Sequence, residues 1–128
     1  MPHAPAPPSA SPSHSAPRWP LAAGALLAAI SIALAAYASH GVGGAVQARL
    51  QLAAVFGFGH GVALAALAPL AVRGFARWAL PGMLAGVLLF SGSLVASHWL
   101  GTPTTLAPFG GSLMILAWLL LAIGAMRR

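Results

Sequence analysis

Four long apolar stretches dominate the chain, and polar residues gather between them. The stretches cover about 21–38, 50–72, 79–100 and 109–126. Each is close to the roughly 20 residues that an α-helix, rising about 1.5 Å per residue, needs to cross about 30 Å of hydrocarbon. Glycine and proline collect in the connections, as in Gly101-Thr102-Pro103. The pattern predicts an all-α membrane protein whose residues 21–128 form a bundle of four transmembrane helices.

The composition supports a membrane protein and argues against a soluble one. Of 128 residues, 59% are hydrophobic and 5% are charged; the charged residues are six arginines, with no lysine, aspartate or glutamate. A soluble domain carries about a quarter charged residues. The net charge of +6 arises because acids are missing, not because bases are abundant. We therefore predict that the chain does not bind nucleic acid.

The missing residue types also restrict the chemistry. Without side-chain carboxylates, the chain has no acid pair for hydrolysis, no carboxylate cage for Ca²⁺ or Mg²⁺, and no aspartate behind a serine–histidine nucleophile. Without cysteine, it has no disulfide, thiolate zinc site or iron–sulfur cluster. Five histidines, one tyrosine, four tryptophans and the hydroxyls of Ser and Thr remain. This inventory predicts that the protein is not an enzyme and has no cofactor.

Residues 1–20 differ from the rest of the chain, because they hold seven of the eleven prolines and four serines. Such a segment has no apolar face to bury, so we predict a disordered tail. His3 and His14 lie in it, and a terminal metal site would need a third ligand that the tail does not supply. We interpret both as solvated histidines.

The arginines are divided unequally between the two sides of the predicted membrane. One side has five, namely Arg18, Arg73, Arg77, Arg127 and Arg128. The other has Arg49 alone. Because cytoplasmic connections carry the excess of basic residues, both termini are predicted to face the cytoplasm. Aromatic residues suited to the interfaces agree with this assignment: Trp19 and Trp78 on the inner side, Tyr37 and Trp99 on the outer side.

An alternative interpretation makes the first stretch a cleavable signal sequence. Arg18 precedes an apolar run that ends in Ala36-Tyr37-Ala38, which resembles an A-x-A cleavage site. The mature protein would then have three spans. The run is longer than the usual signal core of about 7 to 15 residues, which favours a retained helix.

Small residues recur on one face of each predicted helix. They are Gly24, Ala28, Ser31 and Ala35 on the first, Gly57 and Gly61 on the second, Gly82, Gly86, Ser93 and Ser97 on the third, and Gly110, Ala117 and Gly124 on the fourth. Helices in lipid associate by close packing, and small residues mark the contacts. The pattern therefore favours one compact bundle.

His60 is the polar residue that most needs an explanation, because it lies about ten residues into the second stretch. A polar ring near the bilayer centre is costly unless it has a partner. We interpret it as a hydrogen-bonding group between helices rather than a ligand or proton carrier. The expected partners are hydroxyls, namely those of Ser91, Ser93 and Ser31, or a carbonyl beside a glycine on a facing helix. A metal site between His40 and His98 is disfavoured, because His98 points away from its helix's small face.

Four segments resemble motifs of one family. Residues 35–40 resemble a GAFGAH-like motif, residues 56–60 a YQxxH-like motif, and residues 89–94 match LFSGSL. The segment Ala107-Pro108-Phe109-Gly110-Gly111, followed by Trp118, is similar to TPxGG…GW.

In order and spacing the chain resembles the small membrane proteins of domain-of-unknown-function family 423, the YgdD-like proteins related to transmembrane protein 256. The resemblance covers roughly residues 21–127. It implies a four-helix protein of the bacterial inner membrane that keeps its first helix, and it implies no particular activity. The candidate functional or packing residues are His40, His60, Ser91, Ser93, Pro108, Gly110, Gly111 and Trp118.

Three functions remain open at this point. The preferred one is an accessory protein whose bundle binds lipid, another membrane protein or a second copy of itself. The first alternative is an oligomeric transporter of small molecules or protons, although the chain has no embedded acid to couple ions. The second is a haem-binding bundle, which needs two histidines at matching depth on facing helices.

Overall fold

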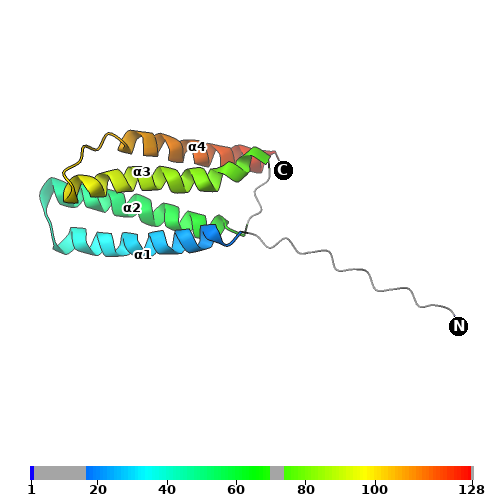
Figure 1. The fold of residues 1–128 in the computed structure, drawn as a ribbon, viewed down its shortest axis with the longest axis horizontal. Coiled ribbons are helices and arrows are strands. Elements are labelled where there is room, and N and C mark those ends of the chain that lie inside the picture. Colours follow the sequence, from blue (N-terminus) through cyan, green and yellow to red (C-terminus); the bar gives the residue numbers. More distant parts are fainter. Residues whose placement is uncertain (2–16, 70–73, 128) are drawn as a thin grey trace.

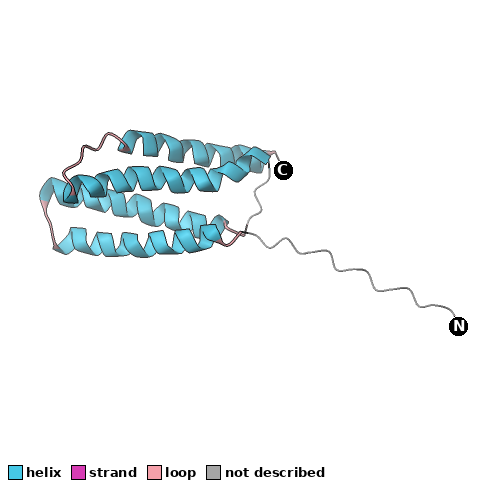
Figure 2. Cartoon of the chain, viewed as in Figure 1, coloured by secondary structure: helices cyan, strands magenta, loops and turns pink. Residues whose placement is uncertain are grey.

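The structure is a computed structural model that describes residue 1, residues 17–69 and residues 74–127. Its elements are α1 (Trp19–His40), α2 (Gly44–Leu67), the 3-10 helix η1 (Gly74–Trp78), α3 (Ala79–Trp99) and α4 (Ala107–Met126). Successive long helices run antiparallel (Figure 1), and the described part of the chain contains no strand (Figure 2). All four long helices are long and apolar enough to cross a membrane, as the sequence predicts. Most of the predicted tail, together with Arg73 and Arg128, lies outside the described residues.

The bounds of α2 differ from those that hydropathy suggests. The helix begins at Gly44, not near residue 50, because Gly43 is extended and Gly44 adopts a φ of 60° that turns the chain into the helix. Polar side chains in this first part made it look like a connection. The helix ends at Leu67; Ala68 still has helical dihedrals, but Pro69 lacks the amide hydrogen that the next helical hydrogen bond would need.

Proline also positions the start of two helices. Pro20 lies in the first turn of α1 and Pro108 in the first turn of α4. An amide hydrogen has no partner in a helix at this position, so proline costs nothing there and its fixed φ suits the helix. Pro108, one of the predicted functional residues, therefore has a structural reason to be where it is.

Glycines let the helices approach closely within each hairpin. Between α1 and α2, a Cβ added to Gly61 would lie 2.7 Å from the carbonyl oxygen of Gly24 and 2.8 Å from the amide nitrogen of Ala28. Between α3 and α4, a Cβ on Gly86 would lie 3.0 Å from the carbonyl oxygen of Gly110. Five of the small residues predicted to mark helix contacts thus lie where the two helices of each hairpin approach closely.

The two hairpins pack together mainly through α2 and α3. Leu64 of α2, Met83 of α3 and Ala117 of α4 are almost fully buried where these three helices meet. Large apolar side chains remain exposed on every helix, for example Ile32 and Leu116. An apolar exterior around a small-residue interior is the arrangement that a lipid environment favours.

The helix order gives the bundle two distinct ends. The terminal end holds the start of α1 and the end of α4, and the connection end holds the α1–α2 and α3–α4 connections (Figure 1). At the terminal end the Arg127 guanidinium lies 5.1 Å from the Phe75 ring centre. At the connection end the rings of Tyr37 and Trp99 are 5.3 Å apart. The arginine and the aromatic residues thus lie at the ends of the bundle that the sequence predicts for them. Which end faces the cytoplasm stays a prediction.

Candidate functional site

His60 lies in an aromatic cluster formed by three helices. Its Nε2 accepts a hydrogen bond from the indole nitrogen of Trp118 on α4, at 3.2 Å. Its Nδ1 lies 2.9 Å from the carbonyl oxygen of Phe56, one turn earlier in α2. The Phe56 ring stacks on the imidazole and also contacts Phe90 of α3, with centroids 4.8 Å apart. Both ring nitrogens of His60 therefore have partners within the protein.

The prediction that a serine hydroxyl is the hydrogen-bond partner of His60 is wrong. Ser91 instead donates to the carbonyl oxygen of Ala53 on α2, at 2.8 Å, and this bond is buried. Ser31 lies against Gly57, where an added Cβ would meet the Ser31 hydroxyl. The prediction failed because it considered only hydroxyls and carbonyls as partners, whereas the donor that reaches His60 is an indole N–H at the edge of a large apolar ring.

Ser93 differs from most of the other serines of the helices. Ser39, Ser97 and Ser112 each donate to a carbonyl of their own helix. Ser93 is 8% exposed, yet its hydroxyl has no hydrogen-bond partner among the described residues. A buried hydroxyl without a partner costs about 1 to 3 kcal/mol and calls for an explanation.

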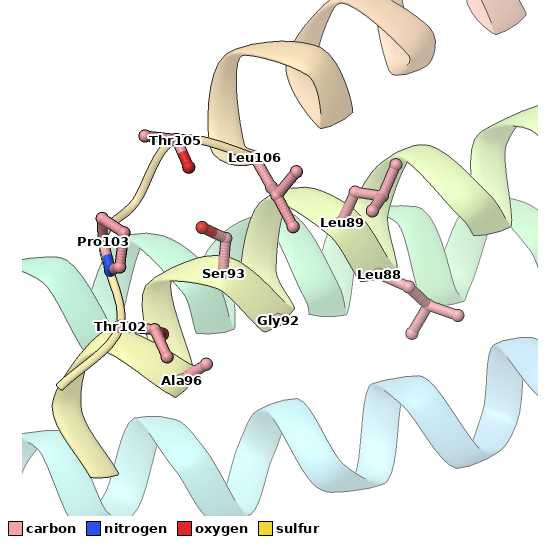
Figure 3. Close-up of a pocket in the computed structure, with 9 residues that line it drawn as sticks. All are labelled: Leu88, Leu89, Gly92, Ser93, Ala96, Thr102, Pro103, Thr105 and Leu106. Carbon is pink, nitrogen blue, oxygen red and sulfur yellow. The ribbon is translucent and has the colours of Figure 1, made fainter. Parts of the chain in front are cut away.

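Ser93 lines a groove of about 430 Å³ between the second half of α3 and the α3–α4 connection. The lining residues are Leu88, Leu89, Gly92, Ser93, Ala96, Thr102, Pro103, Thr105 and Leu106. Figure 3 shows the hydroxyls of Ser93 and Thr105 pointing into the same space. Apart from these two residues and Thr102, the lining is apolar, so the groove combines a hydrocarbon surface with a small set of hydroxyls. We call it the α3 groove.

The LFSGSL segment contributes to both sides of α3. Leu89, Gly92 and Ser93 line the α3 groove, whereas Ser91 faces α2. The sequence therefore identified Ser93, but it gave no sign that the connection supplies Thr102 and Thr105. Only the fold of that connection over α3 brings those hydroxyls to the groove.

Some of the remaining predicted residues pack between helices, and others are exposed. Gly110 allows α4 to contact α3, and an added Cβ on Gly111 would lie 3.9 Å from the Phe90 ring, an ordinary contact. His40 is exposed at the end of α1. His98, disfavoured as a ligand, has its Nε2 3.2 Å from the hydroxyl of Tyr37. The described residues contain no group of three or more potential metal ligands.

Comparison with known proteins places these features in a family. The family model described as "Protein of unknown function (DUF423)" matches residues 34–111, which include His60 and the whole α3 groove. A UPF0382 membrane protein of Haemophilus influenzae is 33% identical over 104 residues, which cover 75% of this chain and 84% of that protein. No solved structure matches the chain. The length of both matches shows that this four-helix membrane protein belongs to the DUF423 family.

Proposed function

We propose that the protein is a non-catalytic accessory protein of the bacterial inner membrane that binds a lipid in the α3 groove. The observation that carries this proposal is the buried, unpartnered hydroxyl of Ser93 in an otherwise apolar groove. The volume falls in the range of about 300 to 1,000 Å³ that is usual for small-molecule sites. A lipid would place a hydrocarbon chain on the leucines and an ester carbonyl, which is a hydrogen-bond acceptor, on Ser93.

The depth of Ser93 suits this assignment. Ser93 precedes Trp99, the last residue of α3, by six residues, which corresponds to about 9 Å along the helix. Tryptophans favour the level of the headgroups, and the interfacial layer is about 5 to 8 Å thick on each side of the bilayer. Ser93 would therefore lie near the boundary where lipid esters meet the hydrocarbon chains.

The state of His60 supports an accessory role over the haem alternative. Iron needs a free lone pair on a ring nitrogen, whereas Nε2 of His60 accepts from Trp118 and Nδ1 bonds to the Phe56 carbonyl. A haem ligand would have to break one of these bonds. A lipid in the α3 groove would leave both hydrogen bonds of His60 intact.

Substitution at Gly92 tests the proposal. Gly92 lines the groove, and an added Cβ there meets no described atom within 4 Å, so Gly92→Leu introduces a side chain that would occupy the groove. Gly59→Leu is the matched control, because Gly59 is equally open but lies on α2. The probe is a phosphatidylethanolamine with a photoreactive acyl chain, and mass spectrometry locates the cross-links.

We expect cross-links within residues 88–106 in the wild type and in Gly59→Leu, and their loss in Gly92→Leu. Equal cross-linking of the groove in all three proteins would refute lipid binding there. If Gly92→Leu instead abolishes a complex with another membrane protein and keeps the lipid cross-links, the groove binds protein and the lipid assignment is wrong.

A further inference from the structure

Arg49 is the one described arginine that is not exposed. It lies in the second turn of α2 at the connection end and is part-buried, whereas Arg18, Arg77 and Arg127 are exposed at the terminal end. Its Nη1 donates to the hydroxyl oxygen of Ser97 on α3, at 3.0 Å. The Ser97 hydroxyl in turn donates to the carbonyl oxygen of Leu94, at 2.7 Å. Arg49 is thus held against α3 by a neutral group.

The charge of Arg49 has no side-chain counter-ion in the protein. The sequence contains no aspartate or glutamate, so no side-chain carboxylate can pair with it. The arginines at the terminal end have aromatic surfaces, since Arg77 lies 5.4 Å from the Trp78 ring centre and Arg127 contacts Phe75. The described residues provide no such ring for Arg49. The other titratable groups at this end, His40, His98 and Tyr37, carry no negative charge in their ordinary states.

A part-buried guanidinium in this situation favours an anion from outside the chain. Arginine has five N–H donors, and the bond to Ser97 uses one of them. Removing a charge from water is costly unless the charge is paired. Phosphate oxygens match the planar fork of the guanidinium and accept two parallel hydrogen bonds.

We propose that Arg49 forms a binding site for a phosphate group at the connection end of the bundle. With the start of α2 at the membrane surface, Arg49 lies about 8 Å of helix below Gly44, at the inner edge of the interfacial layer that holds the lipid phosphates. Ser97 holds the guanidinium in place, and the remaining N–H groups bind the phosphate oxygens. A lipid headgroup and free phosphate share this chemistry. The proposal does not rest on the α3 groove, whose lining excludes Arg49.

The test uses the full-length protein in an uncharged detergent, with delipidation before each measurement. Phosphatidylglycerol, diacylglycerol with the same chains, and inorganic phosphate are added separately. Native mass spectrometry counts bound lipid, and tryptophan fluorescence follows thermal unfolding. The variants are Arg49→Gln, which removes the charge, Arg49→Lys, which keeps the charge without the fork, and Arg77→Gln, an exposed control at the terminal end.

We expect phosphatidylglycerol to bind the wild type and Arg77→Gln and to raise their unfolding temperature more than diacylglycerol does, because diacylglycerol has the acyl chains and esters that suit the α3 groove but no phosphate for Arg49. Arg49→Gln should weaken this binding by about tenfold or more, the effect of losing charge-assisted hydrogen bonds, and Arg49→Lys should weaken it less. The binding should also weaken as salt is raised. The difference between phosphatidylglycerol and diacylglycerol should persist in Gly92→Leu, whose α3 groove is filled, so the phosphate site and the α3 groove can fail separately.

Two results would overturn the proposal. One is equal binding of phosphatidylglycerol by Arg49→Gln and Arg77→Gln. The other, which needs no variant to fold, is an equal effect of phosphatidylglycerol and diacylglycerol on the wild type. If inorganic phosphate protects the wild type as well as the lipid does, and this protection also needs Arg49, the phosphate site is supported and its ligand is the free ion.

Discussion

Trp118 and His60 join two helices that are not neighbours in the chain, through a bond from the indole N–H to Nε2 of the imidazole. The second bond, from Nδ1 to the carbonyl of Phe56, fits the same arrangement only if Nδ1 carries the hydrogen. Both bonds are therefore satisfied by one neutral tautomer. The pair lies partly open to the exterior, because Trp118 is 45% exposed.

We expect the His60–Trp118 bond to contribute modestly to stability. Interhelical hydrogen bonds in membranes average about 0.6 kcal/mol and reach about 1.7 kcal/mol. Trp118→Phe keeps a ring and removes the donor, and His60→Leu removes the acceptor. A double-mutant cycle on the free energy of unfolding in detergent should give a coupling energy of this size, and His60→Gln should be tolerated.

Ser112→Ala is the control for this cycle, because its hydroxyl bonds within α4 and is exposed. It should show no coupling to His60→Leu. A Soret absorbance band in the purified protein, or bound metal that is lost in both His60→Gln and His60→Leu, would show that His60 is a ligand and not a packing residue.

Gly61 and Gly59 provide a matched pair on α2. A Cβ at Gly61 would press on backbone atoms of Gly24 and Ala28, and backbone cannot move aside as a flexible side chain can. A Cβ at Gly59 meets nothing. We expect Gly61→Ala to destabilise the protein by about 1 to 3 kcal/mol, the usual cost of overpacking. Gly59→Ala should be neutral or slightly stabilising, because alanine favours helices more than glycine does. Thermal unfolding of both variants in the same detergent checks this, and equal losses would mean that α1 and α2 do not touch here.

The fold could be predicted because its two determinants are local. The length of each apolar stretch fixes the number of spans, and small residues one turn apart, such as Gly57 and Gly61, mark where a helix contacts its neighbour. Both signals survive in the sequence without knowledge of any partner helix. The start of α2 was harder to predict from the sequence, because the polar beginning of a helix at a membrane interface has the same composition as a polar loop.

The candidate sites depend on which residues meet, and the sequence does not contain that information directly. Ser91 and Ser93 are two residues apart and chemically identical, yet one bonds to Ala53 and the other has no partner. The difference follows from which side of α3 faces α2. Likewise, Trp118 reaches His60 only because α4 packs beside α3 at the right height.

Ser91 and Ser93 should respond oppositely to alanine substitution in lipid-free detergent. Ser91→Ala removes a buried hydrogen bond and leaves the Ala53 carbonyl without that donor, so we expect a loss of about 1 to 2 kcal/mol. Ser93→Ala removes a hydroxyl that has no hydrogen-bond partner among the described residues, so the stability of this variant should be unchanged or slightly higher. Denaturant unfolding measures both, and an equal loss for Ser93→Ala would indicate a hydrogen bond inside the protein.

Deleting residues 2–15 should leave membrane insertion and stability intact. The segment has no apolar face, and Arg18 remains to hold the orientation of α1. The membrane fraction and the unfolding temperature of the shortened protein test this. Loss of the protein from the membrane would show that the tail has a structural role.

Both termini should face the cytoplasm. Five of the six arginines belong to the side that holds the termini and the connection between the second and third spans, and basic residues are retained on the cytoplasmic side. A green fluorescent protein fused to the C-terminus should therefore fluoresce, and an alkaline phosphatase in its place should be inactive. The same phosphatase inserted after Gly43, in the α1–α2 connection, is the control and should be active. An active C-terminal phosphatase would reverse the topology.

A mature N-terminus at Ser39 would mean that the first stretch is a cleaved signal sequence. In that case α2 would lose the glycine contact that Gly24 makes with Gly61.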